Sequence, residues 1–135
     1  NLLRVTEESL FKGIEQVRIG NRITDISRAV QTHVEKHGFT VVRQFGGHGI
    51  GVNLHEAPEV PNYVQKQPSP RILEGMVVAI EPMVNTGSMK VKVLHDQWTV
   101  VTADRKPSAH FEHSVAATAD GPLILSDRNR LVSHQ

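Results

Sequence analysis

The sequence has no cysteine, no excess of charge of either sign and no long apolar run, and each absence excludes a class of protein. Without cysteine, disulfide bonds and thiolate chemistry are excluded. Lysine and arginine total 15 against 14 aspartates and glutamates, so no clustered basic surface for nucleic acid is expected. No apolar stretch approaches the length that spans a membrane. We therefore expect neither a nucleic-acid partner nor a membrane.

The length of 135 residues predicts a single domain, residues 1–135, that buries about two-thirds of the surface of its unfolded chain. The chain opens at Asn1 directly on a helical pattern, with neither a signal peptide nor a starting methionine. These features predict a soluble, cytoplasmic protein, and they suggest that residue 1 is not a natural start.

Two amphipathic helices are predicted at the beginning of the chain. Residues 6–17 carry apolar side chains at helical spacing, with Thr6 as the candidate N-cap. Residues 24–36 repeat the pattern, and Gly38 is placed to end that helix in a left-handed conformation. Both helices are expected to cover one face of a sheet.

The rest of the chain predicts about five strands. Residues 57–70 hold four prolines and are expected to form a loop. Single strands are expected at residues 39–43, 76–84 and 109–118, and a hairpin is expected from residues 91–94 and 98–102. A short extended segment follows at 122–125. Two helices followed by these strands predict an α+β domain with an antiparallel sheet.

The glycine-rich stretch at residues 46–58 is the most unusual part of the chain, and its glycine run is expected to form a loop after the strand at 39–43. Four glycines within residues 46–51 indicate unusual backbone angles or a close approach to another group. Neither the dinucleotide-binding pattern nor the phosphate-binding P-loop is present. The pair His55 and Glu56 is not a zinc-protease helix, because Glu59 stands where the second histidine is needed and Pro58 would break the helix.

Two carboxylates further along the chain, Glu81 and Glu112, lie in or beside apolar strands. Carboxylates rarely occupy such positions without a partner or a metal. One imidazole, from His48, and two carboxylates from separate strands would suit a divalent transition metal. Two of these residues also have an interpretation that needs no metal. His48 can be a packed, hydrogen-bonded histidine, and Glu81 can be an edge-strand residue that faces water.

Strand alternation adds expectations for the residues around Glu112. His110 is two residues away and should share its strand face, whereas His113 should point to the other face and serve a structural role. Trp98, the single tryptophan, has two interpretations: an aromatic side chain of the hairpin that packs on the core, or the lining of a substrate pocket.

The runs GGHGIGVNLHEAPEVPNY, IEPMV, WTVVT and FEHSV, in this order, resemble the bacterial methionine aminopeptidase family, and the resemblance covers nearly the whole chain. It implies the C-terminal portion of the pita-bread α+β fold, which has two pseudo-symmetric halves. It also implies removal of the N-terminal methionine from nascent proteins, with two divalent metal ions (Co, Mn, Fe, Zn or Ni) as cofactors.

The resemblance assigns roles to residues of this sequence. It implies that His48, Glu81 and Glu112 are metal ligands, with Glu112 bridging the two ions. It implies that His55 is catalytic and contacts the substrate amide and the tetrahedral intermediate.

Three further positions follow from the same resemblance. Trp98 would line the methionine pocket, together with Leu54 where many relatives carry phenylalanine. His110 stands where relatives commonly have glutamine, and we expect it to hydrogen-bond the Glu112 carboxylate rather than bind the metal.

The family also uses two aspartates from the first half of its fold, and the only aspartate before His48 is Asp25, on a predicted helix. The sequence therefore predicts at most one weak metal site in this chain, inactivity of the chain alone, and a missing N-terminal half as its partner. The alternative is a non-catalytic pita-bread module that binds peptides or protein partners. A prolyl peptidase of the same fold is disfavoured by the HEAPEVPNY and WTVVT runs.

Overall fold

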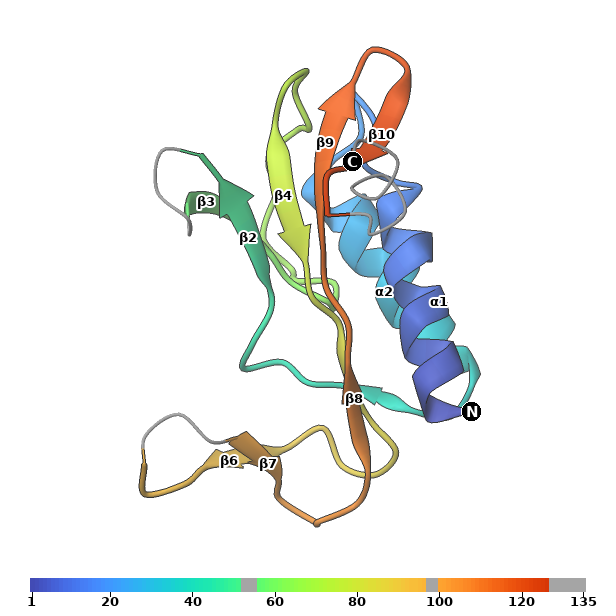
Figure 1. Cartoon of the computed structure of the whole chain (residues 1–135), viewed down its shortest axis with the longest axis vertical. Coiled ribbons are helices and arrows are strands. Elements are labelled where there is room, and N and C mark those ends of the chain that lie inside the picture. The colour runs from blue at the N-terminus through green and yellow to red at the C-terminus, as the bar shows by residue number, and fades with distance from the viewer. Residues whose placement is uncertain (52–55, 97–99, 127–135) are drawn as a thin grey trace, which may run out of the picture.

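The structure is a computed structural model that describes residues 1–51, 56–96 and 100–126. Two helices, α1 (Leu2–Ile14) and α2 (Ile23–Lys36), lie side by side and cover one side of the antiparallel strands (Figure 1). This confirms the predicted α+β class with two helices on an antiparallel sheet. Within the described ranges, neither helix is long and apolar enough to cross a membrane.

Helix α1 begins earlier than predicted, and Thr6 is not its N-cap. The Val5 amide donates to the carbonyl of Asn1 at 2.9 Å, which places the first turn at the start of the chain. Thr6 is fully buried and its hydroxyl donates to the Leu2 carbonyl at 2.7 Å. The apolar face continues through Val5 and Leu2 towards the N-terminus, and its burial extends the helix beyond the capping signal.

Helix α2 matches its prediction to within one residue at its start. The backbone N–H of Arg22 donates to Asp25 Oδ2 at 2.8 Å, so this carboxylate closes the first turn. At the other end, Gly38 has φ +79° and its N–H donates to the Glu35 carbonyl at 2.9 Å. The predicted left-handed ending at Gly38 is confirmed.

A five-stranded antiparallel sheet carries the glycine-rich segment. Its strand order is β10-β9-β4-β2-β3, made of β2 (Gly47–Ile50), β3 (Glu56–Val60), β4 (Val77–Ile80), β9 (His113–Thr118) and β10 (Gly121–Ile124). The glycine run was predicted as a loop and is strand β2, and the first part of the predicted loop at 57–70 is strand β3. Both predictions were wrong because these segments lack strand propensity and take their conformation from neighbouring strands.

The remaining strands form a three-stranded sheet, in the order β1-β5-β8, and a hairpin of β6 and β7. Their bounds are Thr40–Val41 (β1), Met83–Asn85 (β5), Val91–Val93 (β6), Val100–Thr102 (β7) and Ser108–His110 (β8). The predicted hairpin is confirmed.

The two long strands predicted at 76–84 and 109–118 are each divided. Together with β2, β3 and β10, these divisions bring the described residues to ten strands rather than about five. Pro82, which has no N–H for the ladder, stands in the first division. At its division, the first segment passes from β4 of the five-stranded sheet to β5 of the three-stranded sheet, and the second passes from β8 of the three-stranded sheet back to β9 of the five-stranded sheet.

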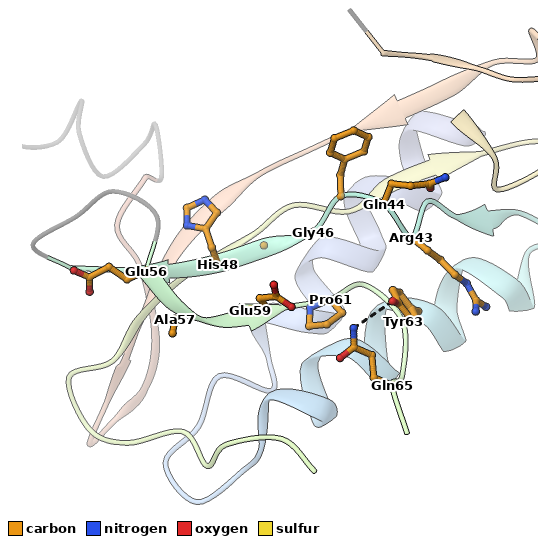
Figure 2. A pocket seen from close by; sticks show the side chains of 12 residues that line it. Arg43, Gln44, Gly46, His48, Glu56, Ala57, Glu59, Pro61, Tyr63 and Gln65 are labelled. Carbon is orange, nitrogen blue, oxygen red and sulfur yellow. Dashed lines mark hydrogen bonds between the residues drawn. The ribbon is translucent and has the colours of Figure 1, made fainter. Parts of the chain in front are cut away.

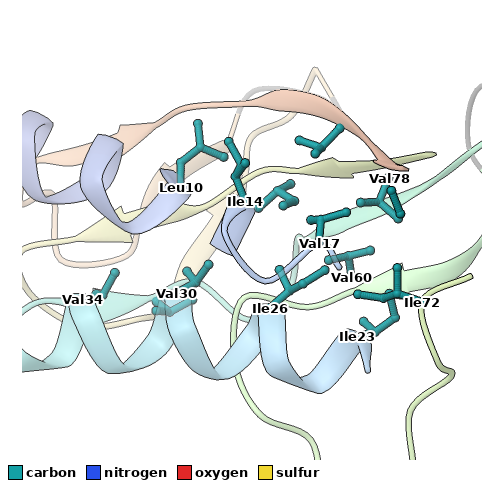
Figure 3. Packing of buried hydrophobic residues seen from close by; sticks show 14 of the residues in the cluster. Leu10, Ile14, Val17, Ile23, Ile26, Val30, Val34, Val60, Ile72 and Val78 are labelled. Carbon is teal, nitrogen blue, oxygen red and sulfur yellow. The ribbon is translucent and has the colours of Figure 1, made fainter. Parts of the chain in front are cut away.

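The hydrophobic core lies between the helices and the strands (Figure 3). Leu10 and Ile26 from the helices pack with Val78 and Ile80 from β4, and all four are at most 1% exposed. Burial of one such side chain contributes about 1.5–3 kcal/mol. Because side chains alternate along a strand, the neighbours of Val78 and Ile80 point to the face that the helices do not cover.

Candidate metal centre

His48 stands on the sheet face away from the helices. In β2 it pairs with Ala79 of β4, whereas its neighbour Gly49 pairs with the core residue Val78. His48 is half-buried, while Gly47 and Gly49 on either side of it are buried. The alternation of the strand therefore directs glycine towards the core and the imidazole towards the open face.

The two glycines allow the neighbouring strands to close around His48. A Cβ atom at Gly47 would overlap the carbonyl oxygen of Ala79, and one at Gly49 would overlap that of Ala57. The backbone has ordinary negative φ at both glycines, so the glycines serve close approach rather than unusual angles. Of the two explanations predicted for the glycine run, the structure supports close approach of another group at these two glycines.

Glu81 and Glu112 occupy the two strand divisions, and these divisions face each other. Strand β4 pairs with β9 up to Ile80 opposite His113, and β5 resumes pairing with β8 at Met83 opposite His110. The register is the same on both sides of the gap, so Glu81 lies opposite Glu112. The N–H of Phe111 donates to the carbonyl of Pro82 at 3.3 Å within the gap.

The three predicted ligands converge. One potential ligand atom from each of His48, Glu81 and Glu112 lies within 4.8 Å of the other two. His48 Nε2 is 3.1 Å from Glu81 Oε2, and its Nδ1 is 3.0 Å from the carbonyl oxygen of Gly49. A carbonyl only accepts, so Nδ1 carries the hydrogen and Nε2 is the atom turned to the carboxylate. A backbone partner of this kind fixes the tautomer of metal-binding histidines.

His110 lies near the carboxylate of Glu81. Its Nε2 lies 3.8 Å from Glu81 Oε1, which is longer than a hydrogen bond. The expected hydrogen bond from His110 to Glu112 stays a prediction. The predicted structural character of His113 agrees with its contacts, because its Nδ1 bonds Ser126 Oγ at 2.8 Å and its ring meets Phe11 edge-on.

Asn62 is a neighbour of the site that the sequence did not single out. It is 1% exposed, and its Nδ2 donates to the Glu81 carbonyl at 2.9 Å. This bond ties the backbone of the ligand residue to the segment after β3. The only signal in the sequence was the position of Asn62 inside the conspicuous HEAPEVPNY run.

A cavity of about 500 Å³ adjoins β2 and β3 and includes His48 in its wall (Figure 2). Glu59 and Tyr63 lie on its lower side in this view, where the guanidinium carbon of Arg43 stands 4.8 Å from the Tyr63 ring centre. The other predicted site residues Leu54, His55 and Trp98 lie outside the described residues.

Comparison with known proteins places this chain in a family. The sequence model of metallopeptidase family M24 matches residues 1–119. The chain belongs to metallopeptidase family M24. Within the family it is similar to the methionine aminopeptidase of Clostridium perfringens, at 58% identity over 125 residues, and to methionine aminopeptidase 1 of Bacillus subtilis, at 54% over 125 residues. Each alignment covers 93% of this chain and 50% of the relative, so the chain spans about half the length of these M24 proteins.

Solved structures give the same result. Methionine aminopeptidase from Thermotoga maritima superimposes with a TM-score of 0.90 at 44% identity, covering 94% of this chain and 51% of that one. Prolidase from Pyrococcus furiosus, at 19% identity and a TM-score of 0.67, shares the fold. These structural neighbours confirm the predicted pita-bread fold.

The donor set of this M24 chain fits a divalent metal. Two carboxylates directly opposite each other on paired strands repel, and a cation between them relieves the repulsion. One imidazole nitrogen with carboxylate oxygens suits ions such as Mn, Fe, Co, Ni or Zn. Asp25, the only aspartate before His48, instead caps α2 and contacts Arg28 at 3.3 Å.

Proposed function

We propose that this chain supplies part of the active site of a methionine aminopeptidase, which removes the N-terminal methionine from nascent proteins. The observation that carries the proposal is the convergence of His48, Glu81 and Glu112 on one open sheet face. Two findings support it. These three residues stand in motifs that resemble those of the family in residue type and order, and two methionine aminopeptidases are 58% and 54% identical to this chain.

In this proposal His48 Nε2 and the carboxylate of Glu81 would hold a divalent ion, and Glu112 would serve as a ligand for both ions of the complete enzyme. Bound divalent ions of this kind supply Lewis acidity that polarises a peptide carbonyl and activates water for attack on it. The hydrogen bond from His48 Nδ1 to the Gly49 carbonyl keeps Nε2 directed at the ion. The strand pairing holds the two carboxylates in place without a flexible loop.

The remaining roles concern the substrate. We assign to His55 the donation of a hydrogen bond to the oxygen that becomes negatively charged during attack, a contribution commonly worth about 3–4 kcal/mol. Trp98 and Leu54 would line the pocket for the methionine side chain. His110 would orient a ligand carboxylate from outside the coordination sphere.

The chain alone is proposed to be inactive. The resembled family completes its metal site with two aspartates, and Asp25 is engaged in capping α2. The relatives are about twice as long as the matched region, which leaves room for those ligands in the rest of a whole protein. The partner of this chain would be that other half of the fold.

The test combines this chain with the separately produced portion of the Clostridium perfringens relative that the alignment leaves uncovered. With Co²⁺ or Mn²⁺ present, the mixture should release methionine from a Met-Ala-Ser peptide, while each part alone should not. His55→Ala and Glu112→Ala should abolish the release, and Glu74→Gln, at an exposed loop position, should not.

Two outcomes would contradict the proposal. Robust turnover by the purified 135-residue chain would show that no second half is needed. Binding of the peptide by the mixture without any cleavage would favour the alternative, a pita-bread module that binds peptides without hydrolysis.

A further inference from the structure

The helix pair carries a second group of potential metal ligands, which belongs neither to the strands nor to the site described above. His33 and His37 are one turn apart on α2, and their ring centroids are 4.6 Å apart. Glu8 reaches them from α1. Residues four apart on a helix share one face, so both imidazoles are available to the same ligand.

The ligand atoms of this group are already close together. One potential ligand atom from each of Glu8, His33 and His37 lies within 4.8 Å of the other two. His33 Nε2 is 3.0 Å from Glu8 Oε1. His37 Nδ1 lies 2.8 Å from the carbonyl oxygen of His33 and must donate to it, which leaves Nε2 of His37 as a lone-pair donor.

We propose that Glu8, His33 and His37 form a separate binding site for a divalent transition ion of the zinc or nickel class, which links the two helices. Two imidazole nitrogens and one carboxylate oxygen match the preference of these ions, whereas Mg²⁺ and Ca²⁺ prefer oxygen ligands alone. The ion takes the place of the hydrogen shared by His33 and Glu8, and water fills its remaining positions.

The surroundings of the group support this assignment. His33 is 13% exposed in its side chain and Glu8 is 41% exposed, so an ion can enter from solvent beside a half-buried imidazole. The hydrogen bond from His33, and next to it the Arg4 guanidinium, lower the pKa of Glu8, which keeps its carboxylate charged. Arg4 Nη1 lies 3.0 and 3.1 Å from the two carboxylate oxygens, so the ion shares Glu8 with a cation and binds less tightly than at an uncontested carboxylate.

This site changes the expected number of ions. The expectation of at most one weak site counted only the ligands on the strands, and the helix group adds another. An ion here binds the folded helix pair more tightly than the unfolded chain, because only folding brings Glu8 to the two histidines. It therefore stabilises the packing of α1 on α2.

The decisive experiment is calorimetric titration with Zn²⁺ of the 135-residue chain carrying His48→Ala, which removes a ligand from the strand site. We expect about one equivalent of zinc to bind per chain. Adding His37→Ala should weaken this binding at least ~10-fold, since it removes one of only three protein ligands. Adding His95→Ala, at an exposed histidine of the β6–β7 hairpin, should leave it unchanged.

An NMR measurement covers the case in which the double variant fails to fold. In the His48→Ala chain, substoichiometric Zn²⁺ should shift the ring signals of His33 and His37 before that of His95. The proposal is overturned if no zinc binds to the His48→Ala chain, if His37→Ala leaves binding unchanged, or if the His33 and His37 signals stay in place while zinc binds.

Discussion

Glu81 and Glu112 lie directly opposite each other at a place where two antiparallel strands both leave one sheet for the next. The pairing of Ile80 with His113 and of Met83 with His110 fixes this relationship on both sides. Carboxylates in such a position repel each other. The arrangement therefore costs stability in the metal-free chain and favours a cation between the two side chains.

Glu112→Gln should have opposite effects on the chain without and with metal. Removal of one of two opposed charges should raise the free energy of unfolding in EDTA by about 0.2–1 kcal/mol. With Co²⁺ or Mn²⁺ present, the same variant should be less stable than the wild type, because it loses a ligand and hence the stabilisation that binding gives. Thermal unfolding with and without metal measures both effects.

Glu74→Gln is the matched control, since it removes the same charge at an exposed loop position, and it should change neither measurement by more than about 0.5 kcal/mol. A Glu112→Gln chain that is destabilised in EDTA would show that the carboxylate has a stabilising partner other than a metal.

Gly47→Ala should disturb the site through the backbone. The added Cβ would overlap the Ala79 carbonyl, so β2 and β4 must move apart, at a cost of about 1–3 kcal/mol. Metal affinity should fall as well, because His48 is the next residue. Gly46→Ala is the control: its Cβ would lie 3.2 Å from the Val60 carbonyl oxygen, and its cost should be smaller. Equal costs for the two variants, measured by urea unfolding, would contradict this explanation.

Ile26→Ala should lower the free energy of unfolding by about 2–5 kcal/mol. Ile26 is fully buried between α2 and the strands, so truncation leaves a cavity in the core (Figure 3). Leu73→Ala, at a side chain that is 61% exposed, should stay within about 0.5 kcal/mol of the wild type. Similar losses for both variants in urea titrations would mean that the core is not where the structure places it.

The chain alone should associate with itself at high concentration. Strand β3 is one of the two end strands of the five-stranded sheet, and Phe45, 41% exposed, precedes the neighbouring strand β2. End strands and exposed aromatic side chains favour association. Sedimentation should show dimers or larger species that decrease in Phe45→Ser. A chain that remains monomeric across the concentration range would refute the expectation.

Asp104→Ala should lower stability at neutral pH but not in acid. Hydrogen bonds from the backbone N–H groups of Ser88 and then Lys106, at 2.8 and 3.1 Å, lower the pKa of Asp104. A carboxyl whose pKa is lowered by folding stabilises the protein above its ordinary pKa, and this contribution disappears as pH falls through the folded value. The stability difference between wild type and variant should therefore vanish in acid. A difference that is constant from neutral to acidic pH would exclude this cause.

Several features of this protein follow from the sequence because their causes are local. Apolar spacing predicted both helices, and Gly38 marked the end of α2 because a left-handed residue there favours glycine. The β6–β7 hairpin was likewise visible in its residue types. The residue types of His48, Glu81 and Glu112 were sufficient to predict a metal site. The four motif runs in their order indicated the family, and the M24 model matches residues 1–119.

Other features depend on pairing between distant segments. The glycine run became strand β2 because β3 and β4 supply its hydrogen-bond partners, which its own composition does not reveal. Only the shared register of two divided strands placed Glu81 opposite Glu112. Only the packing of α1 on α2 brought Glu8 to His33 and His37. Local sequence sets the conformation a segment prefers, whereas these contacts join residues far apart in the chain, and the tertiary structure alone decides them.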